Sequence, residues 1–430
     1  MSQATRSQQE ARPDDARGVV GDAALRPAVE LVGPWLQNNG DGLNLWSVLE
    51  HYAETARVGV SSMLGGDGLP PDAALAWVKW PTGTRQLAGH LLRRDAGEVL
   101  RALKHRVGLA VLSEASLAQR GLMDGRAMAG LLDCSGFAYG DVWSLPRVDR
   151  RIQQYQRVKD HGGRLVMLPQ AFGPFTKPEV RDRVGRLLGM CDLIFARDPV
   201  SLEHLHTLEG PAGRCELAPD ITHLLEGRPP WDRGDGEAAA AWQRRVLIVP
   251  NARMLDRTES DVARGYEALV GRAVDATRRA GLEPWLMVHE ANDRPLADRL
   301  ARSLGSAGGG EPLTVVQEDA RTSKAMIAAS FAVIGSRYHS LISALSSGVP
   351  AVGTSWHHKY EALFADYGQE EFLLSPADPE ELQTRVLDRL LDGAARESAA
   401  QRIAERAAAQ KQRVVEAWAK VDACLGVGAG

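Results

Sequence analysis

The fold of this chain is decided by Ser336-Arg337-Tyr338-His339-Ser340-Leu341 and the two short apolar runs on either side of it. Residues 331–335 form an apolar, partly β-branched run that is typical of a buried strand. Apolar residues then recur at helical spacing until Gly348 and Pro350, which end a helix. Residues 351–354 form a second short strand. The unit therefore predicts a right-handed crossover between two parallel strands.

Both predicted strands end at groups that attract anions. Arg337 and His339 follow the first strand, and Trp356-His357-His358-Lys359 follows the second. Open α/β sheets bind ligands at the carboxyl ends of their strands. Ser336 is predicted to cap the helix, whose first N–H groups add partial positive charge. The pattern predicts a site for phosphate or carboxylate. The alternative is that Arg337 pairs with an acidic neighbour and His339 merely packs.

Short apolar runs alternate with helical stretches along most of the chain. In the first half, strands are predicted at residues 29–33, 57–60, 131–134, 164–168 and 193–195; in the second half, at 245–250, 285–288 and 313–316. This alternation predicts an α/β fold with two Rossmann-like domains that face each other across a cleft.

The predicted domains cover residues 28–226 and 244–378 and are joined by a linker over 227–243, where proline and glycine turn signals gather. Residues 379–424 are rich in helix formers and are predicted to pack as helices along both domains. Residues 1–27 are predicted to be a disordered tail, and residues 425–430 a flexible one.

Composition excludes several classes of protein. The 430 residues are 44% hydrophobic and 25% charged, which is a globular composition, and the formal net charge of −4 does not suggest nucleic-acid binding. The four cysteines show no paired spacing, so neither a disulfide framework nor a zinc site is expected, as in a reducing cytoplasm. No stretch has transmembrane length and no secretory signal begins the chain, so we expect a cytoplasmic protein. No G-x-G-x-x-G motif follows a predicted strand, so we predict no dinucleotide cofactor. No carboxylates have the spacing of a metal site, so we predict no metal.

An ordered set of motifs resembles the polysaccharide pyruvyl transferase family. The set comprises N-N-G-D at 38–41, D-C-S-G-F-A-Y-G-D-V-W at 133–143, L-P-Q-A-F-G-P-F at 168–175, A-R-D-P-V-S at 196–201, S-R-Y-H-S-L-I-S-A-L-S-S-G-V-P at 336–350 and W-H-H-K at 356–359. The chain departs from the family at 135–137, where many members carry a glycine run. The resemblance implies a fold similar to the GT-B glycosyltransferases, phosphoenolpyruvate as the donor and no metal.

The site chemistry and the resemblance together predict a division of roles. The predicted donor-binding residues are Arg337, Lys359, Ser336 and Ser340, with Arg197 from across the cleft. His339, assisted by Arg337, is the predicted proton donor, because imidazole titrates near neutral pH. His357 and His358 are weaker candidates that more often serve structure. The predicted acceptor contacts are Asn39, Asp41, Asp141 and Gln170.

Simpler interpretations of these residues stay open at this point. Arg197 could form a local ion pair with Asp198, and the 38–41 loop could be a turn with a helix N-cap. Phe137, Tyr139 and Trp143 could stack on a sugar or belong to the core.

Two other functions also stay open. One is a glycosyltransferase with a nucleotide-sugar donor, in which Glu361 would hold the ribose; the other is a glycan-binding protein without activity. The sequence leaves open the acceptor sugar, the hydroxyls bridged, the stereochemistry, the pathway and the oligomeric state, and a homo-oligomer is compatible with it.

Overall fold

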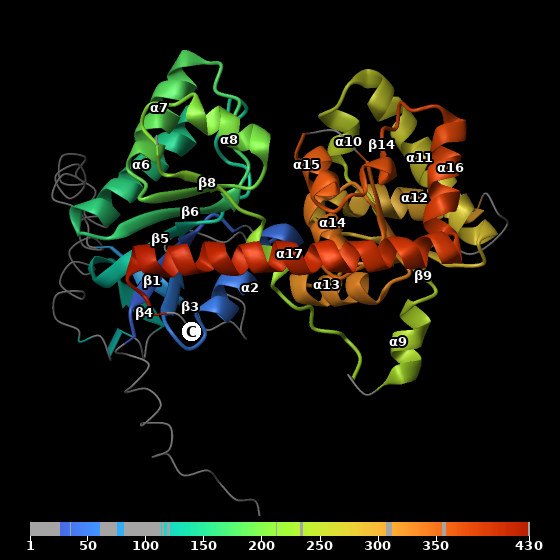
Figure 1. Cartoon of the computed structure of the whole chain (residues 1–430), viewed down its shortest axis with the longest axis horizontal. Helices are drawn as coiled ribbons and strands as arrows, with labels where there is room; N and C mark the ends of the chain where they lie inside the picture. The colour runs from blue at the N-terminus through green and yellow to red at the C-terminus, as the bar shows by residue number, and fades with distance from the viewer. Residues whose placement is uncertain are drawn as a thin grey trace, which may run out of the picture.

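The computed structural model describes residues 26–34, 36–60, 75–80, 113, 116–117, 121–211, 213–232, 235–306, 312–354 and 358–428. Most of the predicted N-terminal tail and His357 lie outside these ranges. Figure 1 shows two α/β units side by side, bridged by one long helix. The α/β fold predicted from the sequence, with two domains and a long C-terminal helix, is confirmed.

The first unit is built on an eight-stranded parallel sheet with the strand order β4-β3-β2-β1-β5-β6-β7-β8. The strands are β1 (Ala28–Val32), β2 (Arg57–Val60), β3 (Leu75–Lys79), β4 (Leu122–Asp124), β5 (Met128–Asp133), β6 (Arg164–Gln170), β7 (Leu193–Ala196) and β8 (Cys215–Leu217). The α-helices are α2 (Asn39–His51), α6 (Leu145–Asp160), α7 (Pro178–Gly189) and α8 (Pro199–His206). Every residue of β1 and β7 is buried, as expected of parallel strands that are covered on both faces.

The second unit has a six-stranded parallel sheet with the order β11-β10-β9-β12-β13-β14. Its strands are β9 (Arg245–Val249), β10 (Glu283–Met287), β11 (Thr314–Val316), β12 (Ala332–Gly335), β13 (Ala351–Thr354) and β14 (Leu373–Leu374). Its helices are α10 (Arg253–Asp256), α11 (Ser260–Arg279), α12 (Arg294–Ser306), α13 (Ala320–Ala329), α14 (Tyr338–Leu345), α15 (His358–Asp366) and α16 (Glu380–Leu391). The crossover read from the opening motif is β12-α14-β13, whose two strands pair in parallel.

One helix contributes to both hydrophobic cores. Helix α17 (Gly393–Leu425) is 33 residues long and runs across both units in Figure 1. Ile403 and Ala407 belong to the core of the second unit, whereas Val414 and Trp418 belong to that of the first. The helix ends at Gly426, which has a φ of +66° and so takes the left-handed conformation that closes many helices.

The predicted linker and the predicted C-terminal tail both contain buried residues. The predicted linker contains α9 (Gly236–Trp242), and Trp242 is buried in the second core with its ring edge-on to Trp285 at 5.2 Å. The predicted C-terminal tail begins with Leu425 and Val427, which are buried in the first core. Their apolar side chains sit where α17 ends against the sheet, so this part of the flexible-tail prediction is wrong.

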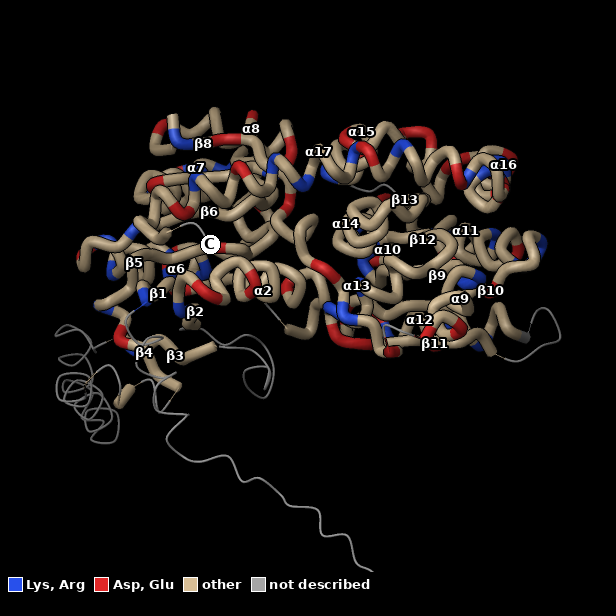
Figure 2. The backbone as a smooth tube through the Cα atoms, turned by 60° about the horizontal axis from the view of Figure 1, so that its bottom comes forward, with Lys and Arg blue, Asp and Glu red and all other residues tan. Residues whose placement is uncertain are grey.

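The two units meet at the start of α2. The backbone N–H of Asn39 donates to the carbonyl of His289 at 3.0 Å, and α2 packs on α13 (Figure 2). Gly40 is needed at this contact, because a Cβ atom there would come within 2.3 Å of Nδ1 of His339. The junction brings the carboxyl ends of the two sheets face to face.

Candidate active site between the two sheets

A cavity of about 910 Å³ opens where the carboxyl ends of the two sheets meet. Residues directly after β1, β5, β7, β9, β10 and β12 line it, together with Lys359 near the start of α15. The lining also includes one face of α6 and the first turn of α2. The location agrees with the general rule that open α/β sheets bind ligands at this edge.

The cavity is strongly basic although the chain as a whole is slightly acidic. Among the described residues that line it are seven lysines or arginines and two carboxylates. The cations are Arg147, Arg150, Arg151, Arg197, Arg253, Arg337 and Lys359, and the carboxylates are Asp41 and Glu290. Such a lining favours an anionic ligand, but each cation must be judged by its partners.

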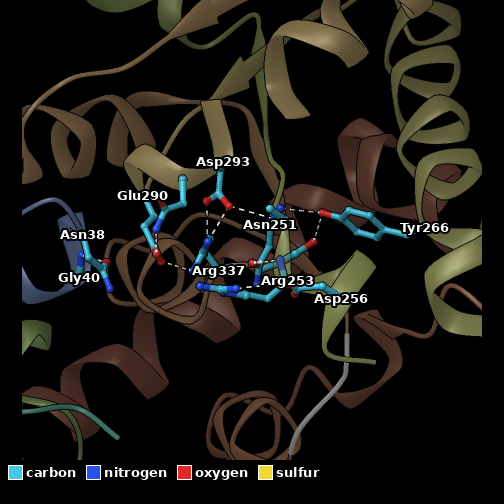
Figure 3. Close-up of polar contacts among 12 residues, drawn as sticks. Asn38, Gly40, Asn251, Arg253, Asp256, Tyr266, Glu290, Asp293 and Arg337 are labelled. Carbon is cyan, nitrogen blue, oxygen red and sulfur yellow. Dashed lines mark hydrogen bonds and ion pairs between the residues drawn. The ribbon is translucent and has the colours of Figure 1, made fainter. Parts of the chain in front are cut away.

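Arg337 lines the cavity with its charge already compensated. Its guanidinium donates two hydrogen bonds to Asp293, at 2.7 and 2.5 Å, and a third to Glu290 (Figure 3). Burial disfavours the charged form, but these contacts hold the pKa of Arg337 above its usual range. The pairing with acidic neighbours that the sequence left open is therefore the arrangement observed, and Arg337 is not an uncompensated clamp for an anion.

Arg197 and His339 share one buried carboxylate. Asp220 accepts a hydrogen bond from Arg197 at 3.2 Å, and its Oδ2 lies 3.4 Å from Nε2 of His339. Burial opposes ionisation of Asp220, but His339 and Arg197 outweigh it and keep its pKa well below the usual range. Asp220 therefore stays ionised and fixes both neighbours. The partner of Arg197 is Asp220 and not Asp198, which caps α8 instead.

Lys359 is in a different environment from the arginines. It is 9% exposed, and its amine lies 5.3 Å from the centre of the Tyr338 ring. Burial, together with the nearby charges of Arg197 and Arg337, lowers the pKa of Lys359 to about 7. A buried amine of this kind gains a proton readily when an anion binds beside it.

The two serines of the opening motif form hydrogen bonds within the second unit and do not line the cavity. Ser336 is buried and hydrogen-bonds to the hydroxyls of Tyr266 and Thr354, each at 2.7 Å. Ser340 donates to the carbonyl of Arg337 at 2.7 Å. Arg337, not Ser336, is the N-cap residue of α14, so the predicted cap is wrong. Neither serine lines the cavity, because both side chains turn into the sheet–helix junction.

Of the predicted acceptor residues, Asp41 lines the cavity, from the first turn of α2. Asn39 lies outside it: its amide donates to the carbonyl of Glu318 at 3.0 Å and to Ser323 at 2.9 Å across the junction between the units. Asn38 caps α2 by accepting from the N–H of Gly40. The 38–41 loop thus combines a cap, an interdomain contact and one cavity carboxylate.

Gln170 and Asp141 do not face the cavity. Gln170 is fully buried at the end of β6, where its amide donates to the carbonyl of Asp133 at 3.1 Å. Asp141 accepts hydrogen bonds from Thr176, at 2.9 Å from the backbone and 2.5 Å from the hydroxyl. Both residues stabilise the loops after β5 and β6, so the prediction that they touch the acceptor does not fit their positions.

The structure also shows where the remaining residues lie whose roles the sequence left open. His358 lies outside the cavity lining, and its Nε2 is 3.3 Å from Asp198 of the first unit. Tyr139 is buried and donates to Asp133, whereas Phe137 and Trp143 line the cavity. Glu361 is exposed on α15 and is not part of the lining, so it does not offer the ribose-binding carboxylate of a nucleotide-sugar site.

Sequence reasoning missed the basic face of α6 and the carboxylates that organise the arginines. Arg147, Arg150, Arg151 and Gln154 follow the i, i+3, i+4, i+7 spacing of one helical face, and this signal could have been read from the sequence. The roles of Asp220 and Asp293 could not have been predicted in this way. Asp220 is far in sequence from His339, and Asp293 is far from Arg337.

The arrangement brings together side chains that can bind an anion and move a proton. Lys359 and Arg197 can hold an anion, and the imidazole of His339 can move a proton. The carboxylate of Asp41 lines the same cavity from the first unit. No helix in the described ranges is long and apolar enough to cross a membrane.

Comparison with known proteins identifies a family and a fold. A sequence model of the family described as polysaccharide pyruvyl transferase matches residues 128–358, more than half of the chain. A search of curated proteins finds no matching sequence.

One similar solved structure is that of the Anabaena protein HepE in complex with UDP and glucose. HepE is 11% identical to this chain with a TM-score of 0.53, and the match covers 93% of this chain and 99% of HepE. Trehalose-6-phosphate synthase is 12% identical with a TM-score of 0.54, covering 92% and 99%. The Staphylococcus aureus MnaA–UDP structure is 11% identical with a TM-score of 0.50, covering 89% and 91%. At these identities the likeness establishes a GT-B-like fold and nothing about ligands.

Proposed function

Because the chain belongs to the polysaccharide pyruvyl transferase family, we propose that it transfers a pyruvyl group from phosphoenolpyruvate to two hydroxyls of a sugar or glycan, forming a ketal and releasing phosphate. The family and the fold support the coarser conclusion, a transferase that modifies glycans. The observation that carries the finer one is the basic lining of the cavity, seven cations against two carboxylates among the described lining residues. Phosphoenolpyruvate carries both a phosphate and a carboxylate, so it suits such a lining.

Lys359 and Arg197 are the proposed donor-binding residues. Both line the cavity, and they are close enough for the charge of Arg197 to depress the pKa of Lys359. Binding of the dianionic donor would restore the proton on Lys359 and so compensate the cost of burying that charge. Arg337 is assigned a positioning role, since Glu290 and Asp293 already neutralise it.

His339 is the proposed acid. A proton passes from the imidazole to the methylene carbon of phosphoenolpyruvate, the electron pair of the C=C bond forms the new C–H bond, and the adjacent carbon becomes cationic. A sugar hydroxyl attacks that carbon and loses its proton to a base, for which Asp41 in the facing domain is the candidate. A second hydroxyl then forms the other C–O bond as the bond between that carbon and the phosphate oxygen breaks. The proton of this hydroxyl leaves with the phosphate, and the ketal is closed. Asp220, whose Oδ2 lies 3.4 Å from Nε2 of His339, keeps the imidazole in place.

The test is a donor screen followed by product analysis. The chain is incubated with phosphoenolpyruvate and a panel of galactose-, mannose- and glucose-type acceptors, and inorganic phosphate is measured. We expect phosphate release that depends on the acceptor, and an acceptor mass raised by one pyruvyl group less water. Release of a nucleoside diphosphate from nucleotide sugars, without binding of phosphoenolpyruvate, would support the glycosyltransferase alternative. Binding of glycans without turnover of either donor would support the non-catalytic one.

A further inference from the structure

One face of α6 forms a basic wall on the N-terminal side of the cavity. Arg147, Arg150, Arg151 and Gln154 all line the cavity, at positions that fall on a single face of an α-helix. The wall belongs to the first unit, whereas Lys359 belongs to the second. The proposed donor contacts and mechanism leave this wall unused.

The members of this wall differ in how they are held. Arg151 lies 3.5 Å from the buried carboxylate of Asp133, and Gln154 donates to Glu30 at 2.7 Å, so both are tied to groups of the first core. Arg147 and Arg150 are exposed, and within the described part of the chain neither forms an ion pair. One turn of helix separates them, so their guanidiniums can reach the same ligand.

A pair of aromatic side chains lies beside Arg147, one of the two exposed arginines. The guanidinium of Arg147 lies 5.0 Å from the centre of the Trp143 ring, and Trp143 meets Phe137 edge to face at 6.3 Å. Both rings line the cavity. The indole N–H of Trp143 is buried without a hydrogen-bond partner in the described part of the structure. Aromatic faces bind the apolar face of a sugar, and the neighbouring guanidiniums suit an anionic group one helical turn away.

We propose that the N-terminal side of the cavity selects an acceptor that carries an anionic group, a phosphate or a carboxylate, which Arg147 and Arg150 bind while the sugar ring lies on Phe137 and Trp143. This inference rests on the proposed function, because it assigns the acceptor side of the same cavity. A neutral acceptor would leave two arginines in the wall without a ligand, whereas a planar guanidinium fork matches phosphate and carboxylate oxygens.

The first experiment measures anion binding while the donor site is filled. Inorganic pyrophosphate is titrated calorimetrically into the full chain with and without saturating phosphoenolpyruvate. We expect pyrophosphate to bind in the presence of phosphoenolpyruvate, and the double variant R147Q/R150Q to bind it about tenfold more weakly or worse, since two charge-assisted contacts are lost. The matched control is R186Q/R302Q, which removes the same charge from exposed positions on α7 and α12 that lie outside the cavity lining.

The outcomes separate this inference from the proposed function. Equal pyrophosphate binding by R147Q/R150Q and the unaltered chain overturns the inference, as does an equal loss in R186Q/R302Q or no binding at all. If phosphoenolpyruvate fails to bind, the proposed function fails. The effect of R147Q/R150Q on pyrophosphate binding without phosphoenolpyruvate then still decides the inference.

A second experiment distinguishes the two sources of the anion. Each hexose of the panel is offered as its 1-phosphate, as its uronic acid and as its neutral methyl glycoside. We expect kcat/KM to favour one of the two anionic forms over the neutral form, and R147Q/R150Q to reduce that preference about tenfold. A preference for the neutral glycoside, or an anionic preference that R147Q/R150Q leaves unchanged, overturns the inference.

Discussion

The adjacent parallel strands β12 and β13 are each followed by a cation that lines the same cavity. The two cations differ in the charges that surround them. Arg337, directly after β12, is held by two carboxylates. Lys359, in the segment after β13, lies near Arg197 and Arg337, with Asp198 as the nearby carboxylate that favours its charge. The comparison teaches that the sheet edge decides where a side chain lies, whereas its neighbours decide whether its charge is available to a ligand.

The largest expected effect comes from the other residue that follows β12. His339→Asn should bind phosphoenolpyruvate nearly normally and lose about two to four orders of magnitude in turnover, because the proton donor is removed while the cations remain. Steady-state kinetics and calorimetry measure the two quantities. Unchanged turnover would remove His339 from the mechanism and leave the loop after β12 with structural roles alone.

Arg337→Ala should act mainly on stability. The change leaves the buried carboxylate of Asp293 and the half-buried carboxylate of Glu290 without their cation, which costs about 3–5 kcal/mol of unfolding free energy. The control adds Glu290→Gln and Asp293→Asn, which should recover part of the loss because no unpaired charge then remains. Denaturant unfolding gives the free energies. A fully stable Arg337→Ala that no longer binds phosphoenolpyruvate would show that the contrast between the two cations is wrong.

Lys359→Met should produce the opposite pattern. Donor affinity should fall about tenfold or more, as expected when a charge-assisted contact worth about 1.5–3 kcal/mol is removed. The melting temperature near pH 7 should rise, because methionine is buried without the cost of desolvating an amine next to two guanidiniums. Calorimetric titration and thermal unfolding test both halves, and a drop in melting temperature with intact donor binding would contradict them.

The pH dependence of donor affinity should be the smallest effect. Lys359 has a pKa of about 7 in the free chain, and a bound anion raises it, so binding takes up a proton above pH 7. Affinity should therefore be highest near or below pH 7 and fall by up to about tenfold per pH unit as the pH rises above 7. Lys359→Arg, which stays protonated, should lose this slope. An equal slope in both proteins would assign the titration to another group.

Much of the fold was visible in the sequence because buried parallel strands are continuous apolar runs. The runs at 57–60 and 351–354 coincide with β2 and β13, and strands β12 and β13 pair in parallel as predicted. Strands β3, β4, β8 and β14 were not predicted. They lie at or near sheet edges, and β8, with the sequence Cys-Glu-Leu, has too few apolar residues to stand out.

The sequence by itself determined which strand ends carry Arg197, Arg337 and His339, and the carboxyl-edge rule places these ends together. Only the tertiary structure decided what those residues can do. Asp293 lies 44 residues before Arg337, and Gln170 turns into the core although it ends a strand at the correct edge. The local pattern of apolar residues determines where a strand forms, and the backbone geometry of parallel sheets determines at which sheet edge that strand ends. Charge compensation, burial and pKa depend on side chains from distant segments, which meet only when each domain folds and the two domains pack.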